Sequence, residues 1–345
     1  MIAVVGTGSW GTTLAAVLAR SGIETTLLAR TAAVADELSA KRENRRFLPD
    51  VALPANLKVT HLPEVALPDQ HVVMLVVPAQ RMRENVLAIR PFLPSEGVIV
   101  SAAKGLEVQS GSRMSEVIRE ELGSAWGGRI AALSGPNLAR EVARGLPTAT
   151  VVAAADEHVA RFVQTELQVP HLRVYTNSDL VGVELAGAMK NIIALGAGIC
   201  DGLGFGDNAK AAFLTRGLVE IARLGITMGA NPLTFSGLAG LGDLVATCAS
   251  KLSRNRHVGE QLGRGRRWVD IQPEMTQVAE GVPTTAATRA IARANGVEMP
   301  ITEKMFDVLF EGASPREAVG ELMTRDRKGE LAGIVPQGFR GRGQK

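Results

Sequence analysis

Apolar residues in the first half of the chain form short continuous runs between glycines, prolines and polar residues. Such runs are typical of strands that are buried on both faces of a parallel sheet. They predict strands over residues 2–5, 24–29, 71–78, 97–103, 129–136, 147–154 and 172–175. Helical patterns separate several of these strands, which predicts a doubly wound α/β sheet.

Helical periodicity dominates the second half of the chain. It predicts helices over residues 181–200, 209–224, 236–249, 284–295 and 300–310. The segment TNSD at residues 176–179 is a good N-cap cluster for the first of them. We expect the segment 338–345 to be a disordered end.

Three glycines follow the first predicted strand in the sequence GTGSWG, where Gly6, Gly8 and Gly11 have the G-x-G-x-x-G spacing. A helical stretch and a second strand complete the unit that dinucleotide binding requires. Gly6 permits a tight turn, Gly8 lets the backbone approach a pyrophosphate, and Gly11 allows the helix to pack closely on the strand. The N–H groups at the start of the helix then bind the phosphates. The sequence therefore predicts a Rossmann-type dinucleotide-binding domain over residues 1–178 and an all-α substrate domain over residues 179–340.

The second strand ends at Arg30 and Thr31, where NAD-binding domains usually have Asp or Glu. A guanidinium at this position would pair with the 2′-phosphate of NADP. An arginine that only stacks over the adenine is the alternative. The sequence thus favours NADP and leaves NAD open.

The apolar helix predicted over residues 181–200 carries Lys190 at its centre. An unpaired ammonium is costly to bury, and Glu184 is not three or four positions away, where helix neighbours lie. Lys190 therefore pairs with a distant group or faces a cavity where a displaced pKa is useful, unless it simply extends from the helix to solvent. Asp243, in the glycine-rich segment GLAGLGDL, is the candidate partner because a carboxylate in an apolar setting also needs one.

Other polar residues stand where a ligand would bind. Lys104 follows one predicted strand, and Gly135 and Asn137 follow another. Ligands of open α/β sheets bind beyond the carboxyl ends of strands, although ordinary strand-to-helix loops are the alternative. The sequence Ser-Arg-Asn at 253–255 offers a hydroxyl, a guanidinium and an amide, which suit a phosphate or carboxylate; a helix cap beside a surface arginine would also explain it.

Composition narrows the class of protein. The 345 residues suit two domains, with 46% hydrophobic and 21% charged residues and a net charge of +3. Charged residues inside the segment 181–200 argue against a membrane span, and two cysteines without metal-site spacing indicate a reduced, cytoplasmic protein. The basic clusters at 41–46 and 263–267 lack interleaved aromatic residues, so we expect no nucleic-acid binding. We expect no metal site.

None of the five histidines lies at a strand end or in a glycine-rich motif. A dehydrogenase that reduces a carbonyl needs a proton donor matched to the hydride. A lysine whose pKa is altered by burial is then the best candidate, and Lys190 is that lysine.

Together these motifs resemble bacterial NAD(P)-dependent glycerol-3-phosphate dehydrogenases across nearly the whole chain. The matching segments, in the family's order, are GTGSWGTTLA, LLAR, SAAKGLE, LSGPNLAREV, VGVELAGAMKNIIALGAGICDGLGFGDNAKAA, GLAGLGDLVATC, SRNRHVG and AEGVPTT. The resemblance implies a Rossmann domain followed by a helical substrate domain, and a cytoplasmic homodimer. It also implies interconversion of dihydroxyacetone phosphate and sn-glycerol 3-phosphate, which supplies phospholipid synthesis.

The resemblance also implies roles for residues that match the family's motifs. Besides the three glycines, the implied cofactor-binding residues are Ser9, Trp10, Arg30, Thr31, Lys104, Ala139, Arg254, Val278 and Glu280. The implied substrate-binding residues are Lys104, Gly135, Asn137, Lys190, Asp243, Ser253, Arg254 and Asn255. Lys190 would be the proton acceptor in the oxidation direction. Two departures are that Asn137 stands where the family often has Ser or Thr, and that Ala103 stands where Thr or Cys is common.

The residues and the resemblance predict the same mechanism. Lys190 protonates the developing alkoxide, Asp243 holds that lysine, and Lys104 adds positive charge near the oxygen. Arg254 and Asn255 grip the substrate phosphate. Two alternatives are another lysine-based reductase, such as a 3-hydroxyacid or 6-phosphogluconate dehydrogenase, and an NADP-binding sensor without turnover. The first group lacks the combination of SRN and GLAGLGDL, and a sensor needs no proton donor.

Overall fold

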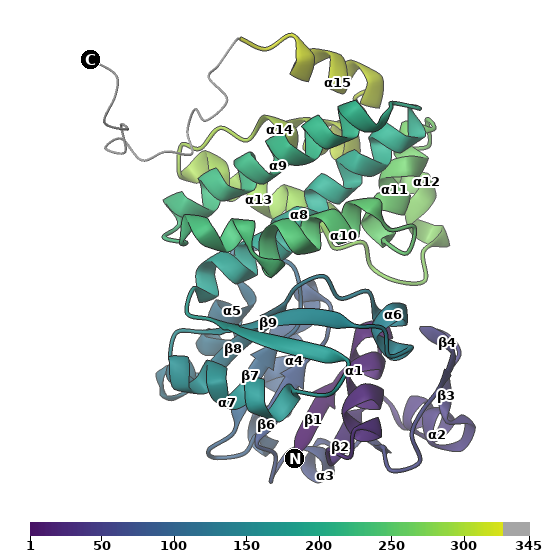
Figure 1. The fold of residues 1–345 in the computed structure, drawn as a ribbon, viewed down its shortest axis with the longest axis vertical. Helices are drawn as coiled ribbons and strands as arrows, with labels where there is room; N and C mark the ends of the chain where they lie inside the picture. The colour runs from purple at the N-terminus through teal and green to yellow at the C-terminus, as the bar shows by residue number, and fades with distance from the viewer. Residues whose placement is uncertain (327–345) are drawn as a thin grey trace.

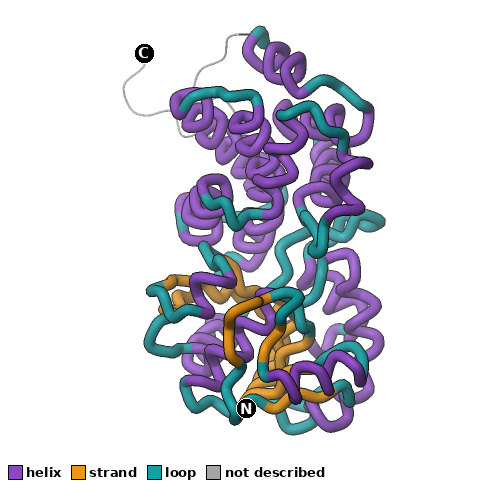
Figure 2. Tube along the Cα trace, turned by 90° about the vertical axis from the view of Figure 1, so that its right-hand side faces the viewer, coloured by secondary structure: helices purple, strands orange, loops and turns teal. Residues whose placement is uncertain are grey.

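The computed structural model describes residues 1–326 and has two parts, a mixed α/β domain and a helical domain (Figure 1). Within residues 1–326, all strands lie in the domain that holds the N-terminus (Figure 2). The tail expected to be disordered, 338–345, lies outside the described residues, as does the end of the predicted substrate domain after residue 326.

The main sheet has eight strands in the order β10-β9-β8-β7-β6-β1-β2-β5. Their bounds are β1 Ile2–Val5, β2 Thr25–Leu28, β5 Lys58–Thr60, β6 Val72–Leu75, β7 Val98–Ser101, β8 Ile130–Ser134, β9 Thr148–Ala154 and β10 Leu172–Asn177. Two further strands, β3 Glu43–Asn44 and β4 Leu48–Ala52, form a separate antiparallel pair.

Neighbouring strands from β5 to β8 are parallel, and their order is that of a dinucleotide-binding sheet. The predicted Rossmann-type fold is therefore confirmed. Strand β9 runs antiparallel to β8 and pairs in parallel with β10. The strand order reverses between β1 and β6, so the glycine turn after β1 lies where such sheets bind ligands.

Helices cover both faces of this sheet. Their bounds are α1 Ser9–Arg20, α2 Ala32–Lys41, α3 Pro63–Ala66, α4 Met82–Ile89, α5 Met114–Leu122, α6 Ala139–Ala143 and α7 Glu157–Leu167. Along β1, Ile2 and Val4 pack in one core with residues of α1 and α7, whereas Ala3 and Val5 pack in another with residues of α4 and α5. Every residue of β1 is thus buried, which explains its continuous apolar sequence.

The helical domain is built around α8, Leu180–Gly202. The other helices are α9 Asp207–Thr227, α10 Asp243–Ala249, α11 Arg254–Gly263, α12 Trp268–Ile271, α13 Gly281–Ala294, α14 Pro300–Phe306 and α15 Pro315–Met323. Asp179 caps α8, since its carboxylate accepts a hydrogen bond from the N–H of Gly182. Within the described residues, α8 is the one helix long and apolar enough to cross a membrane, but 83% of its apolar window is buried inside the protein.

Helices α8 and α11 touch through their backbones because each has two glycines one turn apart. A Cβ on Gly198 of α8 would lie 2.0 Å from a carbonyl oxygen of α11, and one on Gly259 would lie 1.8 Å from the carbonyl oxygen of Leu195. The corresponding closest distances are 2.4 Å at Gly202 and 2.6 Å at Gly263. No side chain fits at these four positions, so the glycines permit the close approach of the two helices.

The predicted helix over residues 236–249 is confirmed over Leu238–Ala249, where a π turn at Leu238–Gly242 leads directly into α10. The chain before it forms a 3₁₀ turn at Pro232–Ser236. A Cβ on Gly240 would lie 2.1 Å from the carbonyl oxygen of Phe235, so a side chain does not fit in the π turn at this point. Helix α8 begins next to the predicted boundary at residue 178, and the division of the chain there stays a prediction.

We expect Gly259→Ala to destabilise the protein, because the added methyl group would meet the backbone of α8. Overpacking a core costs about 1–3 kcal/mol and occasionally more, so the free energy of unfolding in urea should fall by at least about 2 kcal/mol. Gly320→Ala is the control: Gly320 is an exposed residue of α15, and a Cβ added there would meet no atom within 4 Å. That variant should be unchanged or slightly stabilised. Equal loss in both variants would contradict the packing argument.

Candidate active site

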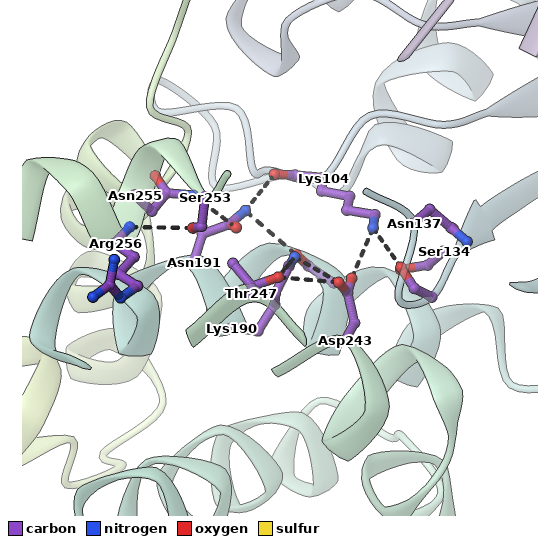
Figure 3. A network of polar contacts seen from close by, with 12 residues as sticks. Lys104, Ser134, Asn137, Lys190, Asn191, Asp243, Thr247, Ser253, Asn255 and Arg256 are labelled. Atoms are coloured by element: carbon purple, nitrogen blue, oxygen red, sulfur yellow. Dashed lines mark hydrogen bonds and ion pairs between the residues drawn. The ribbon is translucent and has the colours of Figure 1, made fainter. Parts of the chain in front are cut away.

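Asp243 lies between two lysines that come from different domains (Figure 3). Its Oδ1 is 2.7 Å from Nζ of Lys190 on α8, and its Oδ2 is 2.7 Å from Nζ of Lys104, in the loop after β7. The side chains are 3% exposed for Asp243, 6% for Lys190 and 17% for Lys104. The structure thus places Asp243, and not Glu184, against Lys190, as the sequence analysis expects.

Further polar groups hold the two ammonium groups. Lys190 also donates to Oγ1 of Thr247, and that hydroxyl donates to Asp243 Oδ1 at 3.2 Å. Lys104 donates to the carbonyl oxygen of Gly135 at 2.8 Å. An ammonium has three N–H donors, so each lysine has a donor left for another group. Sequence reasoning missed Thr247, although it stands four positions after Asp243, on the same face of α10.

The electrostatics of the site follow from burial and from this arrangement. Burial lowers the pKa of Lys190 to about 8; the Asp243 carboxylate opposes this shift, and the charge of Lys104 adds to it. Burial by itself would raise the pKa of Asp243, but the two ammonium groups hold it below its ordinary value. Asp243 therefore stays ionised, while Lys190 can gain or lose a proton near neutral pH.

A chain of amide hydrogen bonds lies beside the lysines. The N–H of Gly281 donates to Asn255 Oδ1 at 2.9 Å, and Asn255 Nδ2 donates to Asn191 Oδ1 at 2.9 Å. Asn191 Nδ2 then donates to the carbonyl oxygen of Lys104 at 3.2 Å. This chain connects α13, α11 and α8 to the Rossmann-type domain. Sequence reasoning gave Asn191 no role, because a neighbour of Lys190 in the sequence carries no sign of these tertiary contacts.

The segment 253–255 forms the start of α11. Ser253 is the N-cap, and its Oγ accepts a hydrogen bond from the N–H of Arg256 at 3.2 Å. The first N–H groups of a helix have no partner within the helix and attract anions. The Arg254 side chain is exposed and donates to the carbonyl oxygen of Val278 at 2.8 Å. The Asn255 side chain, by contrast, is held by Asn191 and Gly281.

Gly135 and Asn137 shape the turn after β8. Gly135 has φ +137°, and a Cβ there would lie 3.1 Å from Cα of Thr150. Asn137 Oδ1 accepts a hydrogen bond from Thr150 Oγ1 at 3.0 Å, and its Nδ2 donates to the carbonyl oxygen of Ala149 at 3.2 Å. The amide that departs from the family pattern therefore ties this turn to β9.

The glycine turn after β1 fits a dinucleotide. Gly6 has φ +114°, and a Cβ there would lie 2.5 Å from the carbonyl oxygen of Val76. A Cβ on Gly11 would lie 2.0 Å from the carbonyl oxygen of Gly6, so α1 packs against the turn. A Cβ on Gly8 would have no neighbour within 4 Å. The open space beside Gly8, at the start of α1, suits a diphosphate.

A segment of the helical domain, residues 275–280, reaches the Rossmann-type domain at two points. Ser9 Oγ lies 3.0 Å from Oε1 of Gln277, and the N–H of Ala79 donates to Glu280 Oε1 at 3.0 Å. Burial raises the pKa of Glu280. Its Oε2 and the hydroxyl of Thr284 are buried without a hydrogen-bond partner. These unpartnered oxygens fit a ligand that donates hydrogen bonds.

The remaining cofactor candidates surround the same turn or lie farther along the sheet edge. Arg30 is exposed at the end of β2, and the Thr31 hydroxyl caps α2. Trp10 is partly buried against the core beneath α1. Ala139 begins α6, and Val278 is 44% exposed. In residues 1–326, no group of three or more His, Cys, Asp or Glu side chains is placed to hold a metal ion.

Comparison with known proteins identifies the family. The descriptions "NAD-dependent glycerol-3-phosphate dehydrogenase N-terminus" and "C-terminus" match residues 1–160 and 179–320. A relative from Citrifermentans bemidjiense, named glycerol-3-phosphate dehydrogenase (NAD(P)+), is 52% identical over 95% of this chain and 98% of its own. The chain belongs to this family. The family resemblance inferred from the motifs is therefore confirmed.

Other members of the family agree in sequence and in structure. A glycerol-3-phosphate dehydrogenase (NAD(P)+) from Chlorobium limicola is 51% identical over 96% of this chain and 99% of its own. The crystal structure of glycerol-3-phosphate dehydrogenase from Coxiella burnetii is 39% identical and superimposes with a TM-score of 0.89, over 94% of this chain and 98% of that one. The two-domain architecture predicted from the sequence is thus that of the family.

We expect Asp243→Asn to destabilise the protein, because it leaves the buried ammonium of Lys190 and the partly buried one of Lys104 without a counter-charge. Removing one partner of a buried ion pair costs about 3–5 kcal/mol, measurable as a lower free energy of unfolding in urea. The loss should be larger at about pH 6 than at about pH 9, where a lysine with a lowered pKa is neutral. Asp69→Asn, at an exposed loop residue, should change stability by less than about 0.5 kcal/mol. A pH-independent loss for Asp243→Asn would argue against unpaired ammonium groups as its cause.

Proposed function

We propose that this chain catalyses the NAD(P)-dependent interconversion of dihydroxyacetone phosphate and sn-glycerol 3-phosphate. The observation that carries the proposal is the Lys104–Asp243–Lys190 set, with Asp243 and Lys190 buried and Lys104 partly buried, at the carboxyl ends of the strands, in a chain of the glycerol-3-phosphate dehydrogenase family. A non-catalytic sensor has no need of a proton donor with a lowered pKa. The family match also favours this substrate over those of other lysine-based reductases.

In this proposal Lys190 is the acid–base group. The bound nicotinamide cofactor supplies or accepts the hydride at C2 of the substrate. Asp243 and Thr247 orient two of the three N–H donors of Lys190, and the third protonates the oxygen on C2 during ketone reduction. The same amine, once neutral, accepts the hydroxyl proton in the reverse direction.

Lys104 stabilises negative charge on the same oxygen. Its ammonium donates hydrogen bonds to Asp243 and to the carbonyl oxygen of Gly135. Its backbone carbonyl oxygen accepts a hydrogen bond from Asn191. The three charged groups sum to one net positive charge while Lys190 is protonated. A fixed positive charge in a buried site stabilises a developing alkoxide more than water does.

The start of α11 binds the substrate phosphate. We assign the phosphate to the backbone N–H groups of Arg254 and Asn255 and to the Arg254 guanidinium, with Ser253 capping the helix. This modifies the sequence-based expectation for Asn255, whose side chain holds the helix start in place. Anchoring the phosphate fixes the distant end of the substrate and aligns C2. Gly135 and Asn137 form the opposite wall.

We further propose that NADP is the preferred cofactor, with Arg30 pairing with its 2′-phosphate. The exposed guanidinium stands at the strand end where a carboxylate would favour NAD. We also propose a cytoplasmic homodimer that supplies glycerophospholipid synthesis. The support for the location is that Cys200 and Cys248 are free thiols; the dimer and the pathway rest on the family.

Lys190→Ala should lower kcat for dihydroxyacetone phosphate reduction by about 10²–10⁴-fold, because the proton donor is lost. The assay is NADPH oxidation with dihydroxyacetone phosphate as the sole acceptor, and NADPH affinity, measured by fluorescence, should change little. Lys304→Ala, in the helical domain but outside the candidate site, is the control and should keep the wild-type kcat. Wild-type turnover in Lys190→Ala would refute the acid–base assignment.

The pH dependence of kcat/KM should follow the pKa of Lys190 in the free enzyme, about 8. Reduction requires the protonated amine, so its kcat/KM should be level below that pH and fall about tenfold per pH unit above it. Oxidation requires the neutral amine and should rise with pH through the same region. Profiles recorded in both directions check this, and two profiles that rise together would contradict it.

Arg30→Asp should reverse part of the cofactor preference, because a carboxylate repels the 2′-phosphate and accepts hydrogen bonds from a 2′-hydroxyl. A charge-assisted hydrogen bond contributes about 1.5–3 kcal/mol, so the ratio of kcat/KM for NADPH to that for NADH should fall at least about tenfold. Arg161→Asp, at an exposed position of α7, should leave the ratio unchanged. An unaltered ratio in Arg30→Asp would show that this arginine does not read the 2′-phosphate.

A further inference from the structure

Glu184 is a buried carboxylate on α8 that the proposed chemistry does not use. Its side chain is 7% exposed. It accepts hydrogen bonds from the N–H of Ser115 at 2.8 Å, from Ser115 Oγ at 2.5 Å and from Arg113 Nη1 at 2.6 Å. The Arg113 side chain is itself only 11% exposed. Hydrogen bonds between buried charged groups are strong and depend on geometry, so they fix the position of Glu184 relative to Arg113 and Ser115.

The two partners of Glu184 belong to the Rossmann-type domain. Arg113 is the N-cap of α5, and Ser115 lies in its first turn. Arg113 is fixed a second time, since its backbone N–H and its guanidinium both bond Glu116. Helix α5 in turn packs through Val117 and Ile118 on one face of the sheet. The contact therefore ties α8 to a rigid element of the other domain.

A second contact lies on α8 between Glu184 and Lys190. A Cβ on Gly187 would lie 2.6 Å from Oγ of Ser134, the last residue of β8. The helix therefore lies directly on the end of that strand at this point. Glu184 and Lys190 are six residues apart on an uninterrupted helix, or about 9 Å along its axis. A sliding or rotation of α8 at Glu184 would move Lys190 by a similar amount.

We propose that Glu184 is a positioning residue, which acts with Arg113 and Ser115 to hold Lys190 in register with the strand ends of the Rossmann-type domain. The proposal rests on the proposed acid–base role of Lys190. Neither Glu184 nor its partners need to touch substrate or cofactor. The contact fixes the position of α8 along its own axis and its rotation about that axis. Lys190 on α8 and Lys104 after β7 can then both reach Asp243.

Glu220 is a natural control, because it is also a buried carboxylate that accepts hydrogen bonds from backbone and hydroxyl groups, but within a single domain. Its side chain, on α9, accepts hydrogen bonds from the N–H groups of Ile301 and Thr302 and from Thr302 Oγ1, at 2.8–2.9 Å. The residue is 3% exposed, and its partners begin α14, away from the sheet. Loss of this carboxylate should weaken the fold without moving α8 against the Rossmann-type domain.

The experiment compares Glu184→Gln with Glu220→Gln as full-length enzymes, at a temperature at which both are folded. Each kcat is normalised to active sites titrated with NADPH. We expect kcat of Glu184→Gln to fall about 10- to 100-fold, as a misplacement of about 1 Å produces, with KM for dihydroxyacetone phosphate and Kd for NADPH within about twofold. The solvent isotope effect on kcat should rise, because transfer of the misaligned proton limits turnover. Glu220→Gln should keep kcat and the isotope effect while its unfolding midpoint falls.

The double variant Arg113→Met/Glu184→Gln separates positioning from stability. Removing both charges should raise the unfolding midpoint back toward the wild-type value, from the lower value of Glu184→Gln. The kcat should stay low, because the contact that holds α8 against α5 is still absent. Recovery of kcat together with the midpoint, or an unchanged solvent isotope effect in Glu184→Gln, would overturn the proposal. A failure of the Lys190 assignment is seen independently, as full turnover in Lys190→Ala.

Discussion

The active site depends on one buried carboxylate that has two ammonium groups as partners, one buried and one partly buried. Each lysine donates a hydrogen bond to a different carboxylate oxygen of Asp243, so the Lys104–Asp243 and Lys190–Asp243 interactions depend on each other. Desolvation favours the neutral form of a buried amine, and the carboxylate opposes this only in part because its charge is shared. Burial is the main cause of the lowered pKa of Lys190, about 8, and the charge of Lys104 adds to it. A carboxylate in place of Lys104 would raise the pKa of Lys190 instead of lowering it.

Bringing these groups together requires close backbone packing around α8. Glycines at the α8–α11 contact let the start of α11 approach so near that Asn255 reaches Asn191, the residue after Lys190. Asn191 in turn holds the carbonyl of Lys104, across the domain junction. The candidate phosphate site and the candidate acid–base group are thus connected by a short path of hydrogen bonds. The glycines of the helical domain are as necessary to the site as the charged residues are.

Features that depend on local sequence could be predicted, and those that depend on tertiary approach could not. Burial on both faces makes β1 continuously apolar, so its strand and glycine turn were recognisable. A lysine inside an apolar helix requires a counter-charge, which pointed to Asp243. By contrast, the π turn that leads into α10 depends on the backbone of Gly240 approaching that of Phe235, and α11 has a charged, weakly apolar sequence. The roles of Thr247 and of the Asn255 side chain exist only once distant helices meet.

Helix α8 forms the core of one domain, yet its first turns lie on the sheet edge of the other through Glu184 and Gly187. The two parts of the molecule therefore share a structural element in addition to the contacts between them. A chain that ended before residue 180 would lack the helix that packs against the edge of the sheet. A chain that ended after α8 would expose this apolar helix, because the helices that surround it would be missing. The protein should accordingly melt as one cooperative unit, and during synthesis its first domain becomes complete only when the first helix of the second has emerged.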